Sequence, residues 1–129
     1  VQNTPFDFIT PRKIRDAFLD FPGHEQLKLN KGFNHAYLIE NDEAVLLWDA
    51  ESGRTMTLST DYPCVVFYSG GFLDQRSDTG NQQKPVVGSG LAFEAQYLPD
   101  APKWMGDSLP ILFPGNIYRK KIVFSFGMQ

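Results

Sequence analysis

Apolar and polar residues alternate in three stretches of the chain, residues 54–60, 88–98 and 118–126. A period of two is typical of β-strands, because successive side chains point to opposite faces of a sheet. In residues 54–60, Met56 and Leu58 alternate with threonine and serine, which predicts a strand with one face in water. The last stretch places four large side chains on one face: Tyr118, Ile122, Phe124 and Phe126. We therefore expect antiparallel pairing among these strands.

Two further patterns add to the predicted sheets. Residues 36–40 and 43–49 flank the two-residue turn Asn41-Asp42, which indicates a β-hairpin. Residues 64–68 are apolar on both faces and are followed by the glycine pair at 70–71. This run indicates a central strand that is covered on each side.

The pattern predicts one helix, over residues 11–21. Thr10 is a suitable N-cap, Pro11 suits the first helical position, and the proline and glycine at 22–23 end the helix. The expected fold class is all-β, an antiparallel β-sandwich with one short helix. We expect a single domain over residues 1–129.

Composition excludes several classes of protein. The 129 residues are 42% hydrophobic and 21% charged, which is typical of a folded globular chain. A net charge of -3 with scattered basic residues argues against a nucleic-acid partner. No apolar run approaches the roughly 20 residues that cross a membrane. The lone Cys64 is expected to be a small buried side chain, which fits a cytoplasmic protein.

The spacing of His24 and His35 matches no metal-ligand motif, and the glycine pairs lack the spacing of a phosphate-binding loop. We therefore expect neither a metal nor a cofactor. The chain does not open with methionine and begins in a motif-like stretch. We therefore expect it to be a piece of a longer protein.

Glu94 is the main candidate for chemistry. Period-two geometry puts its carboxylate beside Gln96, opposite the apolar face of residues 88–98. A glutamate on the wet face of a sheet is the alternative interpretation, and spacing alone favours it. Asn34 is a pocket-rim residue or a turn residue. Asp7 is expected to anchor an internal hydrogen bond, with a ligand contact or simple exposure as alternatives.

Large aromatic side chains are the kind that stack on the apolar face of a sugar, although most aromatics in a sandwich belong to the core. The candidates are Trp48, Phe67, Phe72, Tyr97 and Trp104.

Six short sequence motifs follow one another along the chain, and their order is informative. They are Pro5-Phe6-Asp7-Phe8 with Thr10-Pro11-Arg12, Gly32-Phe33-Asn34-His35, Asp49-Ala50-Glu51-Ser52-Gly53-Arg54, the stretch from Phe67 to Asp74, the stretch from Phe93 to Pro102, and Pro114-Gly115 with Tyr118-Arg119. This series resembles successive blocks in the C-terminal part of the aldose 1-epimerase (galactose mutarotase) family. The Glu-x-Gln and Pro-Asp-x-Pro elements at 94–102 are its most specific part.

The resemblance implies a β-supersandwich enzyme, an isomerase of carbohydrate metabolism that interconverts the α and β anomers of an aldose without a metal or cofactor. It implies that Glu94 is the general base, with Gln96 orienting the base or the sugar. Asn34 and Phe72 are the other expected substrate contacts. The family's general acid is a histidine from the N-terminal part of the full-length protein, so it is neither His24 nor His35. We expect the isolated chain to be inactive.

Two departures from the family pattern leave other functions open. Asn34 stands where the family usually has an aspartate, and Val66 and Gly71 stand where it often has glutamine and asparagine. A non-catalytic carbohydrate-binding domain is therefore an alternative, as is a glycoside hydrolase that pairs Glu94 with Asp7 or Asp49. We expect a monosaccharide ligand, and self-association or pairing with the missing N-terminal part through open strand edges.

Overall fold

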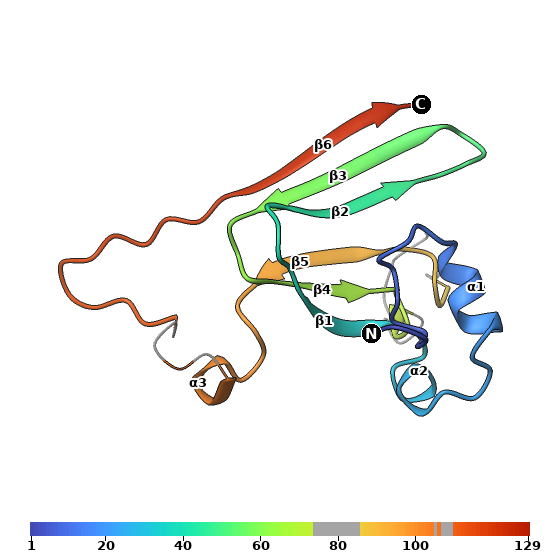
Figure 1. Ribbon diagram of the computed structural model, residues 1–129, viewed down its shortest axis with the longest axis horizontal. Coiled ribbons are helices and arrows are strands. Elements are labelled where there is room, and N and C mark those ends of the chain that lie inside the picture. Colours follow the sequence, from blue (N-terminus) through green and yellow to red (C-terminus); the bar gives the residue numbers. More distant parts are fainter. Residues whose placement is uncertain (74–85, 105, 107–109) are drawn as a thin grey trace, which may run out of the picture. The chain divides into compact units, whose positions relative to one another are not determined.

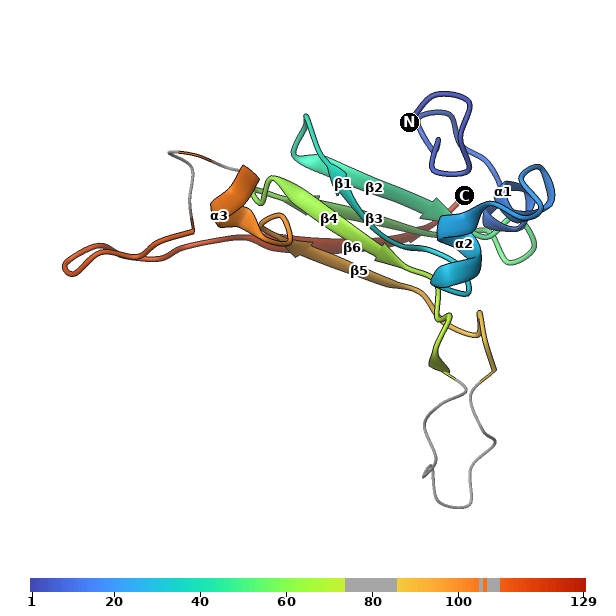
Figure 2. The ribbon, with the colours of Figure 1, turned by 90° about the horizontal axis from the view of Figure 1, so that it is seen from below.

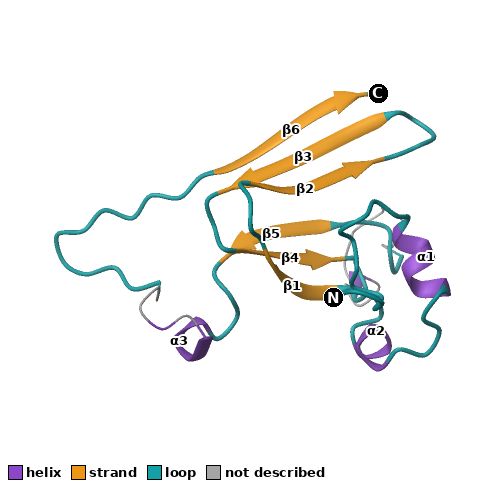
Figure 3. Ribbon diagram, viewed as in Figure 1, coloured by secondary structure: helices purple, strands orange, loops and turns teal. Residues whose placement is uncertain are grey.

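The computed structural model describes residues 1–73, 86–104, 106 and 110–129. The chain divides into two compact units, residues 1–34 with 68–92 and residues 35–67 with 93–129. The all-β prediction is confirmed, and two short helices add to the predicted one (Figures 1 and 3). The elements are α1 Ile14–Leu19, α2 Glu25–Leu29, β1 Asn34–Leu38, β2 Glu43–Trp48, β3 Arg54–Thr60, β4 Cys64–Tyr68, β5 Ala92–Gln96, α3 Ala101–Trp104 and β6 Ile122–Met128.

The first unit is organised around the ring of Phe33, which is fully buried. The rings of Phe6, Phe8 and Phe18 meet it edge to face, with centroids 6.1, 5.3 and 5.1 Å away. Edge-to-face pairs are favourable because the positive edge of one ring meets the negative face of another. This cluster connects the N-terminal segment and α1 to the residue that precedes β1.

Helix α1 begins later than predicted. Its N-cap is Lys13, whose backbone is extended, and no side chain caps the helix. Thr10 therefore does not N-cap it, and that prediction was wrong. Ala17 is the fully buried residue of α1 and anchors the helix to the first unit.

One sheet of the second unit has the strand order β2-β3-β6. Both pairings are antiparallel, with Trp48 opposite Thr55 and Met56 opposite Phe126. The predicted strand over residues 54–60 is confirmed as β3. Strand β6 begins at Ile122 rather than at residue 118.

The predicted hairpin of residues 36–49 was wrong. Strand β1 belongs to the other sheet, whose order is β1-β4-β5. The N–H of Ile39 donates to the carbonyl of Pro63 (3.1 Å), while the carbonyl of Asp42 accepts from the N–H of Thr60 (2.8 Å). The Asn41-Asp42 connection therefore passes from one sheet to the other (Figure 1). An apolar central strand needs a partner on each side, and β4 takes β1 as one of its partners.

Strand β4 is the predicted central strand, with the predicted bounds and with four of its residues buried. Leu58 of β3 is fully buried, and Val65 and Phe67 are nearly so. The strands of both sheets run close to a common direction (Figure 2). This arrangement is that of an aligned antiparallel β-sandwich.

Candidate functional site

Glu94 lies in the middle of β5 with its side chain exposed. Its neighbour Phe93 stacks on Phe67 of β4, with ring centroids 5.2 Å apart and planes 9° from parallel. These two rings therefore lie on one face of the sheet. Because side chains alternate along a strand, Glu94 and Val66 lie on the opposite face.

The register of β1 on β4 identifies a further residue of this face. The N–H of Ser69 donates to the carbonyl of Phe33 (3.0 Å), and the N–H of Ile39 donates to that of Pro63 (3.1 Å). An antiparallel ladder with these bonds at its ends places Ala36 opposite Val66. Residues directly opposite each other point to the same face, so the surface that carries the Glu94 carboxylate has Ala36 and Val66 as apolar members.

Gln96 follows Glu94 on the same face of β5 by strand alternation. Its side-chain amide donates to the carbonyl of Tyr97 at 3.1 Å. This bond fixes the amide group and leaves its oxygen as an acceptor. The structure thus brings together Glu94 and Gln96, as the sequence predicts. Within the described residues, Glu94 makes no hydrogen bond or ion pair that would hold its carboxylate elsewhere.

Asn34 and Phe72 belong to the first unit. Asn34 is the exposed first residue of β1, not a turn residue. Phe72 is half-buried, and its N–H donates to the hydroxyl oxygen of Tyr68 at 2.9 Å. The ammonium group of Lys31 lies 5.5 Å from the centroid of the Phe72 ring, which is within range of a cation–π contact.

The other carboxylates considered for catalysis hold turns. Asp7 accepts an exposed hydrogen bond from the N–H of Ile9, two residues along the chain, at 3.2 Å. Asp49 accepts one from the N–H of Ser52 at 3.0 Å in the β2–β3 turn. Hydrogen bonds from Ser52 hold the pKa of Asp49 below its usual value, because they favour the charged carboxylate.

Comparison with known proteins decides the family. The profile of the family described as aldose 1-epimerase matches residues 1–125 of the chain. The chain belongs to the aldose 1-epimerase family.

Cys64 is free and buried as predicted, and burial raises the pKa of its thiol. No described helix of this family member is long and apolar enough to cross a membrane.

The family relatives are longer than this chain. Aldose 1-epimerase of Escherichia coli K12 is 31% identical over 134 residues, which cover 98% of this chain and 37% of that protein. Human galactose mutarotase is 30% identical over 132 residues, which cover 99% of this chain and 36% of that protein. The crystal structure of a GalM/aldose epimerase homologue from C. elegans superposes with a TM-score of 0.73 at 26% identity, over 99% of this chain and 38% of that one. The chain thus spans little more than a third of the length of these relatives, and its β-sandwich matches the fold of the C. elegans homologue over that part.

An aromatic cluster in the second unit of this epimerase-family chain was not predicted from the sequence. The hydroxyl groups of Tyr62 and Tyr118 are hydrogen-bonded, and the ring of Tyr62 meets that of Tyr97 edge to face at 5.5 Å. The ammonium of Lys120 lies 5.3 and 5.4 Å from the centroids of Tyr62 and Tyr97. The cluster borders a surface cavity of about 250 Å³ between Tyr97 and Lys120. Its members are far apart in sequence, so no local pattern could have grouped them.

The hydrogen bond between the Tyr118 and Tyr62 hydroxyl groups is the largest cause that raises the pKa of Tyr118 from 10.0 to about 12. We expect Tyr62→Phe to return this pKa toward 10.0, measured by ultraviolet titration of tyrosinate. Because the folded pKa is raised, the hydrogen bond stabilises the fold fully below pH 10.0, and this contribution is lost as pH rises through about 12. The variant Tyr118→Phe removes the titration step of Tyr118 and so identifies it in the ultraviolet titration. An unchanged titration in Tyr62→Phe would show that another contact sets the pKa of Tyr118.

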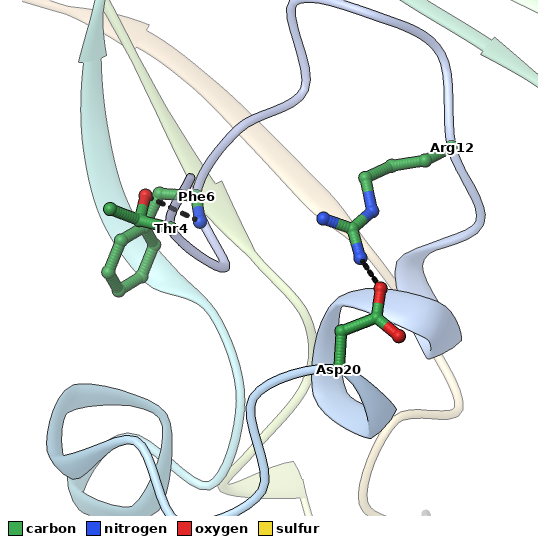
Figure 4. Close-up of polar contacts among 4 residues, drawn as sticks. All are labelled: Thr4, Phe6, Arg12 and Asp20. Atoms are coloured by element: carbon green, nitrogen blue, oxygen red, sulfur yellow. Dashed lines mark hydrogen bonds and ion pairs between the residues drawn. The ribbon is translucent and has the colours of Figure 1, made fainter. Parts of the chain in front are cut away.

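A second cavity, of about 350 Å³, lies in the first unit beside Arg12 and Asp20. Arg12 forms an ion pair with Asp20 at 2.6 Å, and the nearby Thr4 hydroxyl accepts from the N–H of Phe6 at 3.3 Å (Figure 4). The ion pair is partly exposed and occupies the guanidinium group. Neither cavity is lined by the predicted site residues Glu94, Gln96, Asn34 and Phe72.

Proposed function

We propose that this chain contributes the general base, Glu94, to an aldose 1-epimerase that interconverts the α and β anomers of an aldose of the galactose or glucose type. The observation that carries the proposal is the exposed carboxylate of Glu94 on β5, in a chain of the aldose 1-epimerase family. The stack of Phe93 on Phe67 supports it, because the stack directs Glu94 to the other face of the sheet.

The proposed reaction is acid–base catalysis of ring opening. Glu94 accepts the proton of the anomeric hydroxyl while an acid gives a proton to the ring oxygen, and the bond between C1 and the ring oxygen breaks. Rotation about C1–C2 turns the free aldehyde over. Closure by the reverse proton transfers gives the other anomer and restores both groups. We expect the acid to be a residue of the part of the epimerase that lies outside the segment matched by this chain.

Three further residues are proposed to contact the sugar. Gln96 offers an amide oxygen beside Glu94, while Asn34 offers both a donor and an acceptor at the start of β1. Phe72 offers an aromatic ring of the kind that packs on the C–H groups of a pyranose. We expect the cytoplasm as the location, consistent with the free, buried Cys64.

The isolated chain is expected to leave the mutarotation of α-glucose and α-galactose at its uncatalysed rate, measured by polarimetry. The physical reason is that a base without its acid cannot complete the proton transfers. The matched test is a chimera in which residues 1–129 replace the matching segment of the E. coli epimerase. We expect the chimera to catalyse mutarotation. A folded, inactive chimera would contradict the proposed function, and clear activity of the isolated chain would contradict the need for an external acid.

A non-catalytic sugar-binding domain is the second candidate. The observation that favours it is the apolar character of the face around Glu94, where Ala36 and Val66 provide no hydrogen-bonding groups. The neutral Asn34 also lacks the charge of an aspartate. A binder would hold the sugar without turnover in the same chimera. The hydrolase alternative has no such support, since Asp7 and Asp49 are engaged in turns.

A further inference from the structure

Both backbone groups of Phe33 are hydrogen-bonded to one residue, Ser69. The N–H of Ser69 donates to the carbonyl of Phe33 at 3.0 Å, and the N–H of Phe33 donates to the hydroxyl oxygen of Ser69 at 2.8 Å. In an antiparallel ladder the second bond of such a pair goes to a backbone carbonyl. Here a side chain accepts it, so a substitution at Ser69 can remove this bond and leave the other in place.

The two bonds fix the backbone on either side of Phe33. A peptide unit is planar, so the bond to the N–H of Phe33 fixes the plane shared with Gly32, and the bond to its carbonyl fixes the plane shared with Asn34. The ring of Phe33 is fully buried in the aromatic cluster of the first unit. Phe33 is therefore held at its backbone and at its side chain, and the direction in which the chain enters Asn34 is set.

Gly32 makes room for the serine hydroxyl. Its φ of +138° is a conformation that favours glycine, and a Cβ at this position would overlap the Oγ atom of Ser69. The N–H of Gly32 donates to the carbonyl of Leu27 in α2 at 2.8 Å. The bond between the hydroxyl and the N–H of Phe33 is buried, so its loss would leave that N–H without water as a ready substitute.

We propose that Ser69 is a positioning residue for Asn34 and so determines how tightly the sugar is held. This inference rests on the proposed function, in which Asn34 contacts the sugar. Asn34 is exposed at the start of β1, and its amide group can both donate to and accept from sugar hydroxyls. Hydrogen bonds weaken steeply as their angle departs from linear, so an amide that points elsewhere loses them. Ser69 is buried and acts through the peptide between Phe33 and Asn34.

The expected effect is on affinity for the sugar. Phe33, Asn34 and Ser69 all belong to the first unit, whereas Glu94 belongs to the second. The two bonds of Ser69 therefore position Asn34 independently of how Glu94 is held. A change at Ser69 should raise the Kd for the sugar, and it should do so only as long as Asn34 is present.

The test is a double-mutant cycle in the chimera with the E. coli epimerase, with galactose as the probe. Two-dimensional NMR follows the titration, because its resonances report the folded molecules alone and a partly unfolded variant keeps its Kd. We expect Asn34→Ala to raise the Kd about tenfold and Ser69→Ala about fivefold, the range of one lost hydrogen bond. In the Asn34→Ala background, Ser69→Ala should change the Kd less than about twofold, because two residues that act through one contact are not additive.

Ser52→Ala is the matched control. The hydroxyl of Ser52 also accepts from a backbone N–H, that of Arg54 at 3.4 Å, but in the β2–β3 turn. This variant should leave the Kd unchanged. An equal effect of Ser69→Ala in both backgrounds, or no effect in either, would overturn the inference and leave the contact of Asn34 intact. If Asn34→Ala left the Kd unchanged, the proposed sugar contact would be wrong and the inference with it. A chimera that bound galactose without turnover would contradict the catalytic proposal alone.

Amide hydrogen exchange tests the bond itself without a sugar. We expect Ser69→Ala to speed the exchange of the Phe33 N–H at least about tenfold, while Ser52→Ala leaves it unchanged. Ser69→Thr keeps a hydroxyl oxygen as the acceptor and should retain both the slow exchange and the parent Kd within about twofold. Unchanged exchange in Ser69→Ala would show that another group holds the Phe33 backbone, which would overturn the positioning role.

Discussion

Glu94→Gln in the chimeric epimerase is expected to lower kcat by about 10²–10⁴-fold, the usual contribution of a general base. Glutamine keeps the size and hydrogen-bonding shape of the side chain but cannot accept the anomeric proton. Affinity for the sugar should change little, because the variant keeps the face around it. Polarimetry gives the rate, and calorimetric titration with the sugar gives the affinity.

Glu51→Gln is the matched control for this variant. Glu51 is an exposed glutamate in the β2–β3 turn, so the change in charge is the same and the site is untouched. It should retain full activity. If Glu94→Gln kept most of its turnover, Glu94 would be the ordinary surface carboxylate that its spacing alone favours. If the Glu94→Gln and Glu51→Gln chimeras both bound sugar but neither had turnover, the non-catalytic alternative would be supported.

Gly71→Ala is expected to lower the free energy of unfolding by roughly 3 kcal/mol, at the upper end of the usual cost of overpacking. A Cβ at Gly71 would overlap the carbonyl oxygen of Asn30 and lie 2.9 Å from that of Lys31. These obstacles belong to the backbone, so no side chain can move away to make room. Urea denaturation followed by circular dichroism measures the change.

Gly90→Ala provides the comparison. Among the residues that the structure describes, a Cβ there would meet the Leu73 side chain alone, at an ordinary 3.8 Å. We expect its stability to stay within about 0.5 kcal/mol of the parent. Equal stability of the Gly71→Ala and Gly90→Ala variants would show that the backbone of Asn30 and Lys31 moves at little cost to make room for the added Cβ.

Local patterns predicted the strands well because alternation and burial are properties of a few neighbouring residues. Strand β4 was predicted with its observed bounds, since a run that is apolar on both faces has few other solutions. The partner of β1 could not be predicted in the same way. Asn41-Asp42 suits a hairpin turn, yet β1 pairs with the central strand of the other sheet. Pairing depends on which apolar strand needs covering, and that is a property of the whole chain.

The candidate site shows the same division. The strand position of Glu94 and Gln96 followed from period two, whereas the catalytic interpretation of Glu94 came from the resemblance of residues 93–102 to the family. Val66 was singled out in the sequence, but its place on the Glu94 face followed from the stack of Phe93 on Phe67, and Ala36 was added by the register of β1 on β4. The Tyr62–Tyr118 pair joins residues 56 positions apart, a separation that no window of sequence covers.

The stack of Phe93 on Phe67 determines more than the packing of two rings. A one-residue slip of β5 along β4 would move every side chain of β5 to the other face. Glu94 would then lie on the face that now carries the ring of Phe67, and Phe93 would take its exposed place. The stacked pair resists that slip, because the displaced strand would have to bury a carboxylate where two rings now meet. The aromatic contact between Phe93 and Phe67 thus stabilises the strand register that keeps the proposed base exposed.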